Sequence, residues 1–311
     1  SIEVSVGGRK TLEIQLRENT VMLDNVIITA LGLEKKEASL AYSIQKVKGE
    51  ELTRMKEVNM ITALAGKAAG VQINKNSSGI GGSAKVSLRG IRSASGDNQP
   101  LYVIDGVPML NIGTEQAYSA IGGTANAGNR DGGDGISNLN PEDVESISIL
   151  KGAPAAALYG SMAANGVILI TTKKGNTAGQ RNIYFSTGLT FDKAFSLPKM
   201  QNCYGVSDVV DSWGEKAYLP TSNELNDFFR TGLTSITSVS VNYGNEKIQT
   251  YFSYANTTGR GIVDKNQLTK HNINLRETAV MFNQRLRLDG NVNVMRQIVK
   301  NKPVSGGFYM N

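Results

Sequence analysis

The chain has 311 residues, of which 40% are hydrophobic and 19% charged, so it can bury a sizeable core and lacks the composition of a disordered chain. Its net charge is +6, but the basic residues are dispersed and not interleaved with aromatic ones, so we expect a solvated surface and no nucleic-acid partner. Because Cys203 and His271 are the only residues of their types, an intramolecular disulfide, a four-cysteine zinc site and multi-histidine sites are excluded.

The sequence contains no signal for a membrane helix or a leader. No apolar run reaches the roughly 18 residues that a membrane-spanning helix needs. The first residues, Ser1–Val6, lack the basic start and apolar core of a signal peptide. Taken alone, this favours a cytosolic protein. The chain nevertheless starts without methionine inside a predicted strand, so a processed or truncated N-terminus is an equal expectation.

The N-terminal stretch is predicted to be a β-hairpin followed by an extended segment. Apolar residues alternate with polar ones on both sides of Gly7-Gly8 within residues 1–17, which is typical of two short strands with one apolar face. A hairpin of this size is unstable alone, so we expect it to end a small β-domain. The following stretch, VMLDNVIITAL at 21–31, is apolar and β-prone without a helical pattern, and predicts an extended edge strand.

Residues 34–175 predict a mixed α/β unit of the size of one domain. Its clearest helix is expected over 57–69, where the apolar residues form one stripe, Asn59 can cap the start and Gly70 stops it. Pro141 follows Asn140 at the first position of a short helix. Short strands are expected within 34–54 and at 71–73, 85–89, 101–104, 147–151 and 167–172. The last of these, VILITT, is typical of a strand buried on both faces.

Two loops of this unit invite a functional interpretation. The glycine-rich loop 76–83 lacks both phosphate-binding spacings, so it is interpreted as a turn. The loop 111–134 has a length that is usual for functional or mobile segments. In it, Asn129, Asp131 and Asp134 have oxygen ligands for a cation, but the terminal Glu of a calcium loop is absent, so turn chemistry is favoured over a metal site.

The sequence shows no set of catalytic residues. Ser161 lacks the G-x-S-x-G elbow of a nucleophilic serine. Without a visible acid–base pair or nucleophile, we predict that the protein is not an enzyme and uses no cofactor.

After residue 175 the pattern changes to five alternating strands, expected near 183–191, 239–243, 249–258, 271–275 and 286–294. In the last one, Leu286, Leu288, Val292 and Val294 form one aliphatic face and polar residues form the other. Long and short connections alternate, which is typical of outer-membrane barrels. The alternation of apolar and polar side chains along each strand would also appear in a soluble sandwich. A plugged barrel needs about 22 strands. We therefore expect a fragment whose barrel is completed elsewhere.

Three blocks occur in order in the α/β unit. They are LRGI and PLYVIDGVP at 88–91 and 100–108, NRDGGD and ISNLNPEDVESI at 129–134 and 136–147, and KGAPAAALYGSMAANGVILITTKKG at 151–175. Together they closely resemble the plug domain of TonB-dependent outer-membrane transporters of the SusC/RagA family. The resemblance implies an α/β (α+β) plug domain followed by the first antiparallel strands of a transmembrane β-barrel.

The resemblance also implies a division of the chain. Residues 1–20 would end a carboxypeptidase-regulatory-like β-domain, 21–33 would be a TonB-box-like segment, 34–175 the plug, and 176–311 the first barrel strands. The segment for TonB is Asp24, Asn25, Val26, Ile27, Ile28, Thr29 and Ala30. Such a segment can add to a partner's sheet as an edge strand. Asn25 departs from the acidic residue usual there, which puts the register in doubt.

The function implied by the resemblance is import of glycan oligosaccharides or peptides across the outer membrane of a Gram-negative, Bacteroidetes-like bacterium. Implied partners are TonB and a SusD-like surface lipoprotein. Outward plug loops are candidates for substrate contact, through Ser93, Asp97, Asn98, Gln99, Asn111 and Tyr118. A siderophore or cobalamin receptor is the alternative within transport. A soluble or surface binding module or adhesin is the alternative from another class.

Overall fold

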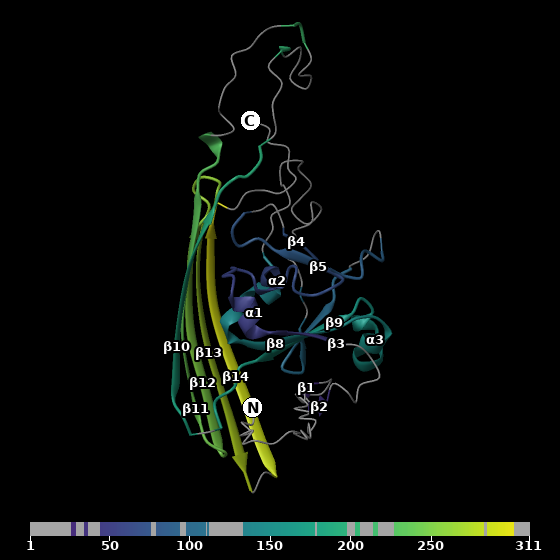
Figure 1. The fold of residues 1–311 in the computed structure, drawn as a ribbon, viewed down its shortest axis with the longest axis vertical. Coiled ribbons are helices and arrows are strands. Elements are labelled where there is room, and N and C mark those ends of the chain that lie inside the picture. Colours follow the sequence, from purple (N-terminus) through teal and green to yellow (C-terminus); the bar gives the residue numbers. More distant parts are fainter. Residues whose placement is uncertain are drawn as a thin grey trace, which may run out of the picture.

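The computed structural model describes residues 26–28, 34–36, 44–75, 79–93, 98–109, 111, 133–177, 179–197, 203–205, 214–216, 227–282 and 285–301. Two parts stand side by side in Figure 1. One is an α/β unit within residues 44–175, called the globule below. The other is a curved antiparallel sheet of long strands, called the wall. Among the described helices none is both long and apolar enough to cross a membrane, a finding that has no bearing on crossing by strands.

The wall has five strands in sequence order, each antiparallel to the next. They are β10 (Asn182–Asp192), β11 (Gly232–Gly244), β12 (Ile248–Arg260), β13 (Gln267–Met281) and β14 (Leu286–Lys300). The end of the wall at which β11 meets β12 and β13 meets β14 is called the turn end. The opposite end, where β10 ends, β11 begins and residues 261–266 join β12 to β13, is called the loop end. The five predicted strands are confirmed.

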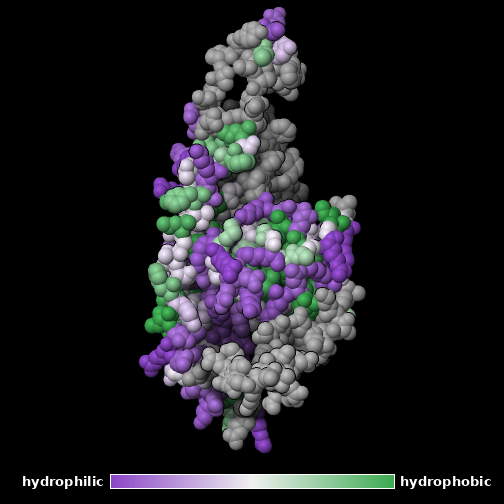
Figure 2. Space-filling view, viewed as in Figure 1, coloured by the Kyte–Doolittle hydropathy of each residue, from purple (hydrophilic) through white to green (hydrophobic). Residues whose placement is uncertain are grey.

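The two faces of the wall have opposite polarity. Along β12, for example, Tyr251, Ser253 and Ala255 are buried against the globule, whereas Phe252 and Tyr254 are exposed on the other face. The register continues this outward apolar surface across the sheet, since Phe252 lies opposite both Val241 and Leu275. Hydrophobic side chains follow the wall in the space-filling view of Figure 2. An apolar outer face with a polar inner face is the arrangement of membrane barrels.

The globule is built on a five-stranded mixed sheet of order β3-β8-β9-β6-β7. Only β6 and β9 run parallel. These strands are β3 (Ile44–Lys48), β6 (Leu101–Ile104), β7 (Val107–Met109), β8 (Val144–Leu150) and β9 (Val167–Thr172). Two separate hairpins complete the described strands, β1 (Val26–Ile28) with β2 (Glu34–Lys36) and β4 (Val71–Lys75) with β5 (Ala84–Leu88).

Short helices cover this sheet. They are α1 (Gly49–Thr53), α2 (Met60–Ala63) and α3 (Ala153–Tyr159), with the 3-10 turns η4 (Gly135–Asn138), η5 (Pro141–Asp143) and η6 (Gly160–Ala163). The central strand β9 confirms its prediction, because Ile168 and Ile170 pack in one apolar cluster and Val167 and Leu169 in another, on opposite faces. Pro141 begins η5 and Asn140 accepts a bond from the Glu142 amide at 3.3 Å.

The helix predicted over 57–69 is much shorter in the structure. Asn59 caps it as expected, accepting a bond from the Ile61 amide at 3.0 Å, and Met60 and Ile61 are fully buried. The regular helix ends at Ala63, and Gly66 adopts a φ of 74°. A left-handed residue ends a right-handed helix, so the predicted length was wrong. Of the predicted apolar stripe, Met60, Ile61, Leu64 and Ala68 are buried and Ala65 is exposed. The predicted strand region 34–54 likewise divides into β2, β3 and α1.

At Gly166, directly before β9, both the backbone conformation and the packing oppose a side chain. Its φ is 99°, and a Cβ there would lie 2.6 Å from Leu88 Cδ1 and 2.9 Å from the Leu150 carbonyl oxygen. Gly70 also has a positive φ, 66°, but open space around it. We expect Gly70→Ala to cost about 1–2 kcal/mol from backbone strain alone. Gly166→Ala should add about 1–3 kcal/mol from overpacking.

Pulse proteolysis across a urea series measures this difference in the stability of the globule. Equal midpoints for the two variants would contradict the close packing at Gly166.

Candidate functional site: the interface between globule and wall

The inner face of the wall is polar and is buried by the globule. At least nine of its side chains combine a polar group with burial, namely Thr234, Ser238, Ser253, Thr257, Lys270, Asn272, Asn274, Arg276 and Thr278. Buried polar groups must find hydrogen-bond partners to offset the loss of water. Much of what joins globule to wall is therefore polar recognition.

Arg276 on β13 is the centre of the largest group of these contacts. Its Nε and Nη2 donate to the two carboxylate oxygens of Asp289 on β14, at 2.9 and 2.8 Å. Its Nη1 donates to Asp105 Oδ2 in the globule at 3.0 Å. The same nitrogen donates to the Thr172 hydroxyl at 2.5 Å and to the Thr172 carbonyl at 3.2 Å. The Arg276 side chain is only 4% exposed. It thus pairs with one carboxylate of the wall and one of the globule.

Asp105 is placed for this contact by the turn between β6 and β7. Its φ of 47° is in the left-handed region, which Asp tolerates better than most residues, and Gly106 follows with φ 87°. Asp105 Oδ1 accepts from the Thr172 amide at 3.0 Å and Oδ2 from the Thr172 hydroxyl at 2.6 Å. The carboxylate therefore fastens the ends of β6 and β9 together and presents them jointly to Arg276.

A second contact joins Tyr251 on β12 to Asp143 of η5. The Tyr251 hydroxyl donates to Asp143 Oδ1 at 2.9 Å, and both residues are fully buried or nearly so. Burial raises the pKa of Asp143, although hydrogen bonds to its carboxylate act in the opposite direction. Burial also lowers the pKa of Lys173, the residue after β9, which donates its amide to the Asp143 carbonyl at 2.8 Å.

A third group of contacts lies around η4 and η5. Lys270 Nζ donates to the Ser137 carbonyl at 2.5 Å, and Asn272 Nδ2 donates to the Asn138 carbonyl at 2.6 Å. Lys56 of the globule pairs with Glu142 and also reaches the hydroxyl of Ser186 on β10. Ser186 also bonds to Glu142 at 3.3 Å, so β10 and β13 contribute side chains to these two turns, as β12 does through Tyr251.

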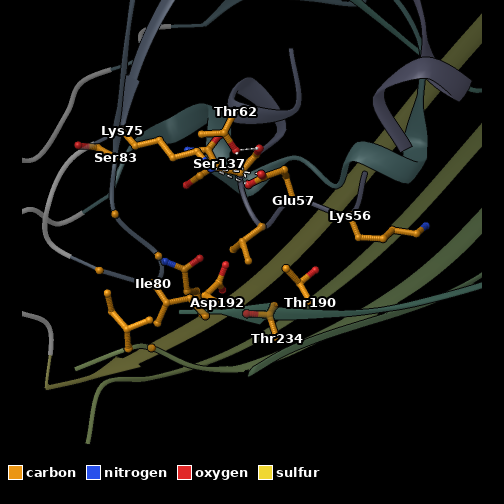
Figure 3. A pocket seen from close by; sticks show the side chains of 18 of the residues that line it. Lys56, Glu57, Thr62, Lys75, Ile80, Ser83, Ser137, Thr190, Asp192 and Thr234 are labelled. Carbon is orange, nitrogen blue, oxygen red and sulfur yellow. Dashed lines mark hydrogen bonds and ion pairs between the residues drawn. The ribbon is translucent and has the colours of Figure 1, made fainter. Parts of the chain in front are cut away.

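A cavity of about 430 Å³ lies between the globule and the loop end of the wall. From the wall, Thr190 and Asp192 of β10 and Thr234 of β11 line it, and Figure 3 shows them facing the globule residues. The globule contributes Glu57 and Lys75, which form an ion pair at 3.0 Å. With hydroxyls and charges of both signs, the cavity has the size and the donors and acceptors for a small polar ligand.

The predicted substrate-contact residues do not line this cavity where they are described. Asn98 Oδ1 accepts from the amides of Arg92 and Ser93, both at 2.8 Å, so Asn98 fixes its own loop. Asn111 donates to Gln99 Oε1 at 3.3 Å and accepts from the Ile136 amide at 3.0 Å. Asp97 and Tyr118 lie outside the described residues. The structure therefore brings together two pairs, Ser93 with Asn98 and Gln99 with Asn111.

Asp134 is the one described member of the predicted metal group. Its carboxylate accepts from the amides of Ala84 and Ser137, at 2.8 and 2.9 Å, and from Asn59 Nδ2 at 3.2 Å. Asp134 thus caps η4 and ties it to β5 and α2. No group of three or more metal-type ligands occurs among the residues the structure describes. Asn129 and Asp131 lie outside those residues, so the metal prediction stays a prediction.

The predicted TonB segment is described only in part. Val26, Ile27 and Ile28 form β1, which pairs with Lys36, Lys35 and Glu34 of β2. Asp24, Asn25, Thr29 and Ala30 lie outside the described residues. The segment is extended where it is described, as the sequence predicts.

The sequence pattern did not identify the residues that join globule to wall. Arg276 and Asp289 were visible only as polar positions of alternating strands, and Asp105 only as part of a turn. A signal existed in the positions of Lys270 and Arg276, because a long cation on the inward face of a barrel strand needs a partner inside. The identity of that partner depends on contacts across more than 100 residues of sequence.

Known proteins are similar to this chain in sequence. Residues 36–167 match the family model of the TonB-dependent Receptor Plug Domain. The chain is 31% identical over 295 residues to TonB-dependent receptor SusC of Bacteroides thetaiotaomicron, which covers 91% of this chain and 27% of that protein. The ferric enterobactin receptor PirA of Pseudomonas aeruginosa is 30% identical over 50% of this chain and 20% of that protein.

A solved structure shares the fold. The RagAB peptide importer in its open-open state has a TM-score of 0.70 and 21% identity, over 92% of this chain and 33% of that one. This chain spans about a quarter of the length of SusC and of two similar receptors of Formosa agariphila. The plug model and the SusC match confirm the resemblance, and RagAB shows the same fold: the chain is part of a SusC/RagA-like TonB-dependent receptor of the Gram-negative outer membrane.

Proposed function

We propose that the protein imports oligosaccharides or peptides across the outer membrane by TonB-dependent displacement of the globule. The observation that carries the mechanism is the interface. The globule has its own apolar core and meets the wall through hydrogen bonds and ion pairs. Interfaces of this polar kind permit relative motion of the two parts, whereas a shared apolar core does not.

The substrate class rests on the comparisons. The match to SusC runs along 91% of the chain, whereas the match to the siderophore receptor PirA covers half of it. RagAB, which shares the fold, is called a peptide importer. These observations favour glycans or peptides over ferric siderophores, with a SusD-like lipoprotein as the surface partner. We propose that the loops with Ser93, Asp97, Asn98, Gln99, Asn111 and Tyr118 contact the substrate.

The division of the chain follows from the same proposal. Residues 1–20 end a β-domain, 21–33 contact TonB, 34–175 form the plug and 176–311 begin the barrel. The three-residue strand β1, paired with β2, supports the contact with TonB, because a short strand can exchange its partner for another sheet.

Uptake by cells tests the substrate class. Cells that lack the protein should lose uptake of fluorescent oligosaccharides or peptides and keep uptake of ferric siderophores, because other receptors carry the latter. Loss of siderophore uptake with unchanged glycan and peptide uptake would replace this function by the alternative.

The contact between Arg276 and Asp105 should hold the globule in place. We expect Asp105→Asn to weaken retention by about 1.5–3 kcal/mol, because it removes a charge-assisted hydrogen bond from Arg276, which stays paired with Asp289. The globule should then become sensitive to protease at lower urea. The matched control is Asp192→Asn, which removes an exposed carboxylate at the loop end. Equal urea midpoints for both variants would show that Arg276 does not hold the globule.

The TonB segment should be needed for uptake and not for substrate binding. Ile27→Pro removes a backbone N–H donor and fixes φ, so strand addition should fail. We expect cells with this variant to bind labelled substrate normally and to lose at least nine-tenths of its uptake. Asn19→Pro, placed before the segment, should leave both unchanged. Normal uptake by the Ile27 variant would place the TonB contact elsewhere.

A further inference from the structure

The outward face of the wall carries a group of mostly basic side chains near the loop end. The strand register places Arg260 beside Gln267 and Lys300 in one row, and His271 beside Arg296 two rows below. These residues alternate in step with the exposed Phe252 and Ile273, so they share the outer face. This group of Arg260, Gln267, His271, Arg296 and Lys300 is called the outer patch below.

The outer patch has excess positive charge. Arg260, Arg296 and Lys300 are exposed, and none of the three has a carboxylate partner in the described part of the chain. Asp264, in the nearby connection, is already paired with Arg230 at 2.6 Å. At the turn end, the outward row of β12 to β14 contains Thr250, Glu277 and Gly290 instead. The cationic excess on the outward positions of these strands is thus confined to the loop end.

His271 is held in a fixed orientation beside these cations. The hydroxyl of Tyr254 lies 3.0 Å from His271 Nδ1, and Asn256 Nδ2 lies 3.1 Å from the same atom. The Tyr254 and His271 rings stack with an interplanar angle of 21°. Because Nδ1 is occupied, Nε2 is the ring nitrogen left to contact a ligand on the outer face.

Directly below the outer patch the surface becomes apolar. The next two rows of β12 to β14 are Tyr254, Ile273 and Val294, then Phe252, Leu275 and Val292, and all six side chains are exposed. The order from the loop end is therefore cationic, then apolar, which matches a lipid with a phosphate headgroup above its acyl chains. In outer-membrane barrels the longer connections are extracellular, so the lipid would belong to the outer leaflet.

We propose that the outer patch binds the phosphate groups of an anionic lipid of the outer leaflet, with its acyl chains along the apolar rows. Arginine suits this role because its planar fork donates two parallel bonds to phosphate oxygens. Charge complementarity and the contiguous apolar surface favour a lipid over a protein partner. The site faces away from the globule, so it is independent of substrate import.

The test uses the full-length protein extracted from outer membranes in detergent. We would compare the wild type with Arg260→Gln/Arg296→Gln/Lys300→Gln by native mass spectrometry, titrating a bisphosphorylated glycolipid and its dephosphorylated form. We expect the wild type to bind the phosphorylated form at least tenfold more tightly, and the triple variant to lose that preference. The matched control, Lys247→Gln/Arg285→Gln, removes basic residues at the turn end and should bind like the wild type.

Equal lipid binding by the wild type and the triple variant would overturn the proposal, as would equal losses in the triple variant and the control. A protein crosslinked to the outer patch in intact membranes would also overturn it. If the triple variant fails to reach the membrane, Lys300→Gln alone should weaken binding of the phosphorylated lipid at least threefold, and unchanged binding would count against the site.

Discussion

Docking of the globule to the wall depends most on Arg276, the side chain with the largest group of contacts between them. A buried guanidinium without a partner is costly, so a cation that paired with the globule alone would leave the wall unstable once the globule moved. Asp289, on the adjacent wall strand, binds two of the guanidinium nitrogens in a bidentate arrangement. Arg276 therefore keeps a counter-charge that belongs to the wall. Of the hydrogen bonds that Arg276 makes, departure of the globule would break only those to Asp105 and Thr172.

The wall has an apolar outer face and a polar inner face, the reverse of a soluble domain, because of what each face contacts. Its outer face contacts lipid, which rewards apolar side chains, so the apolar core of the molecule lies within the globule. The inner face is then polar, and several of its side chains bond to the globule, as Tyr251 and Lys270 do. One alternating strand pattern therefore suits both contact with lipid on the outside and contact with the globule on the inside.

The sequence was sufficient for the elements and insufficient for their contacts. Alternation predicted the five wall strands, and the β-branched run at 167–172 predicted the central strand of the globule. The helix after Asn59 was predicted too long because apolar periodicity continues past Gly66, where the backbone turns left-handed. The pairing of Arg276 with Asp105 could not be predicted, because it depends on how two separately folded parts dock.

The position of β3 has a mechanical consequence. It is an edge strand of the globule's sheet and pairs only with β8, whereas β9 at the centre continues directly into the chain that leads to the wall. Tension applied at the N-terminus enters the sheet at Ile44, and the antiparallel ladder opens there one residue pair after another. Such peeling resists force far less than shearing all pairs at once. Under the proposed displacement, the globule would therefore open first at its N-terminal edge strand.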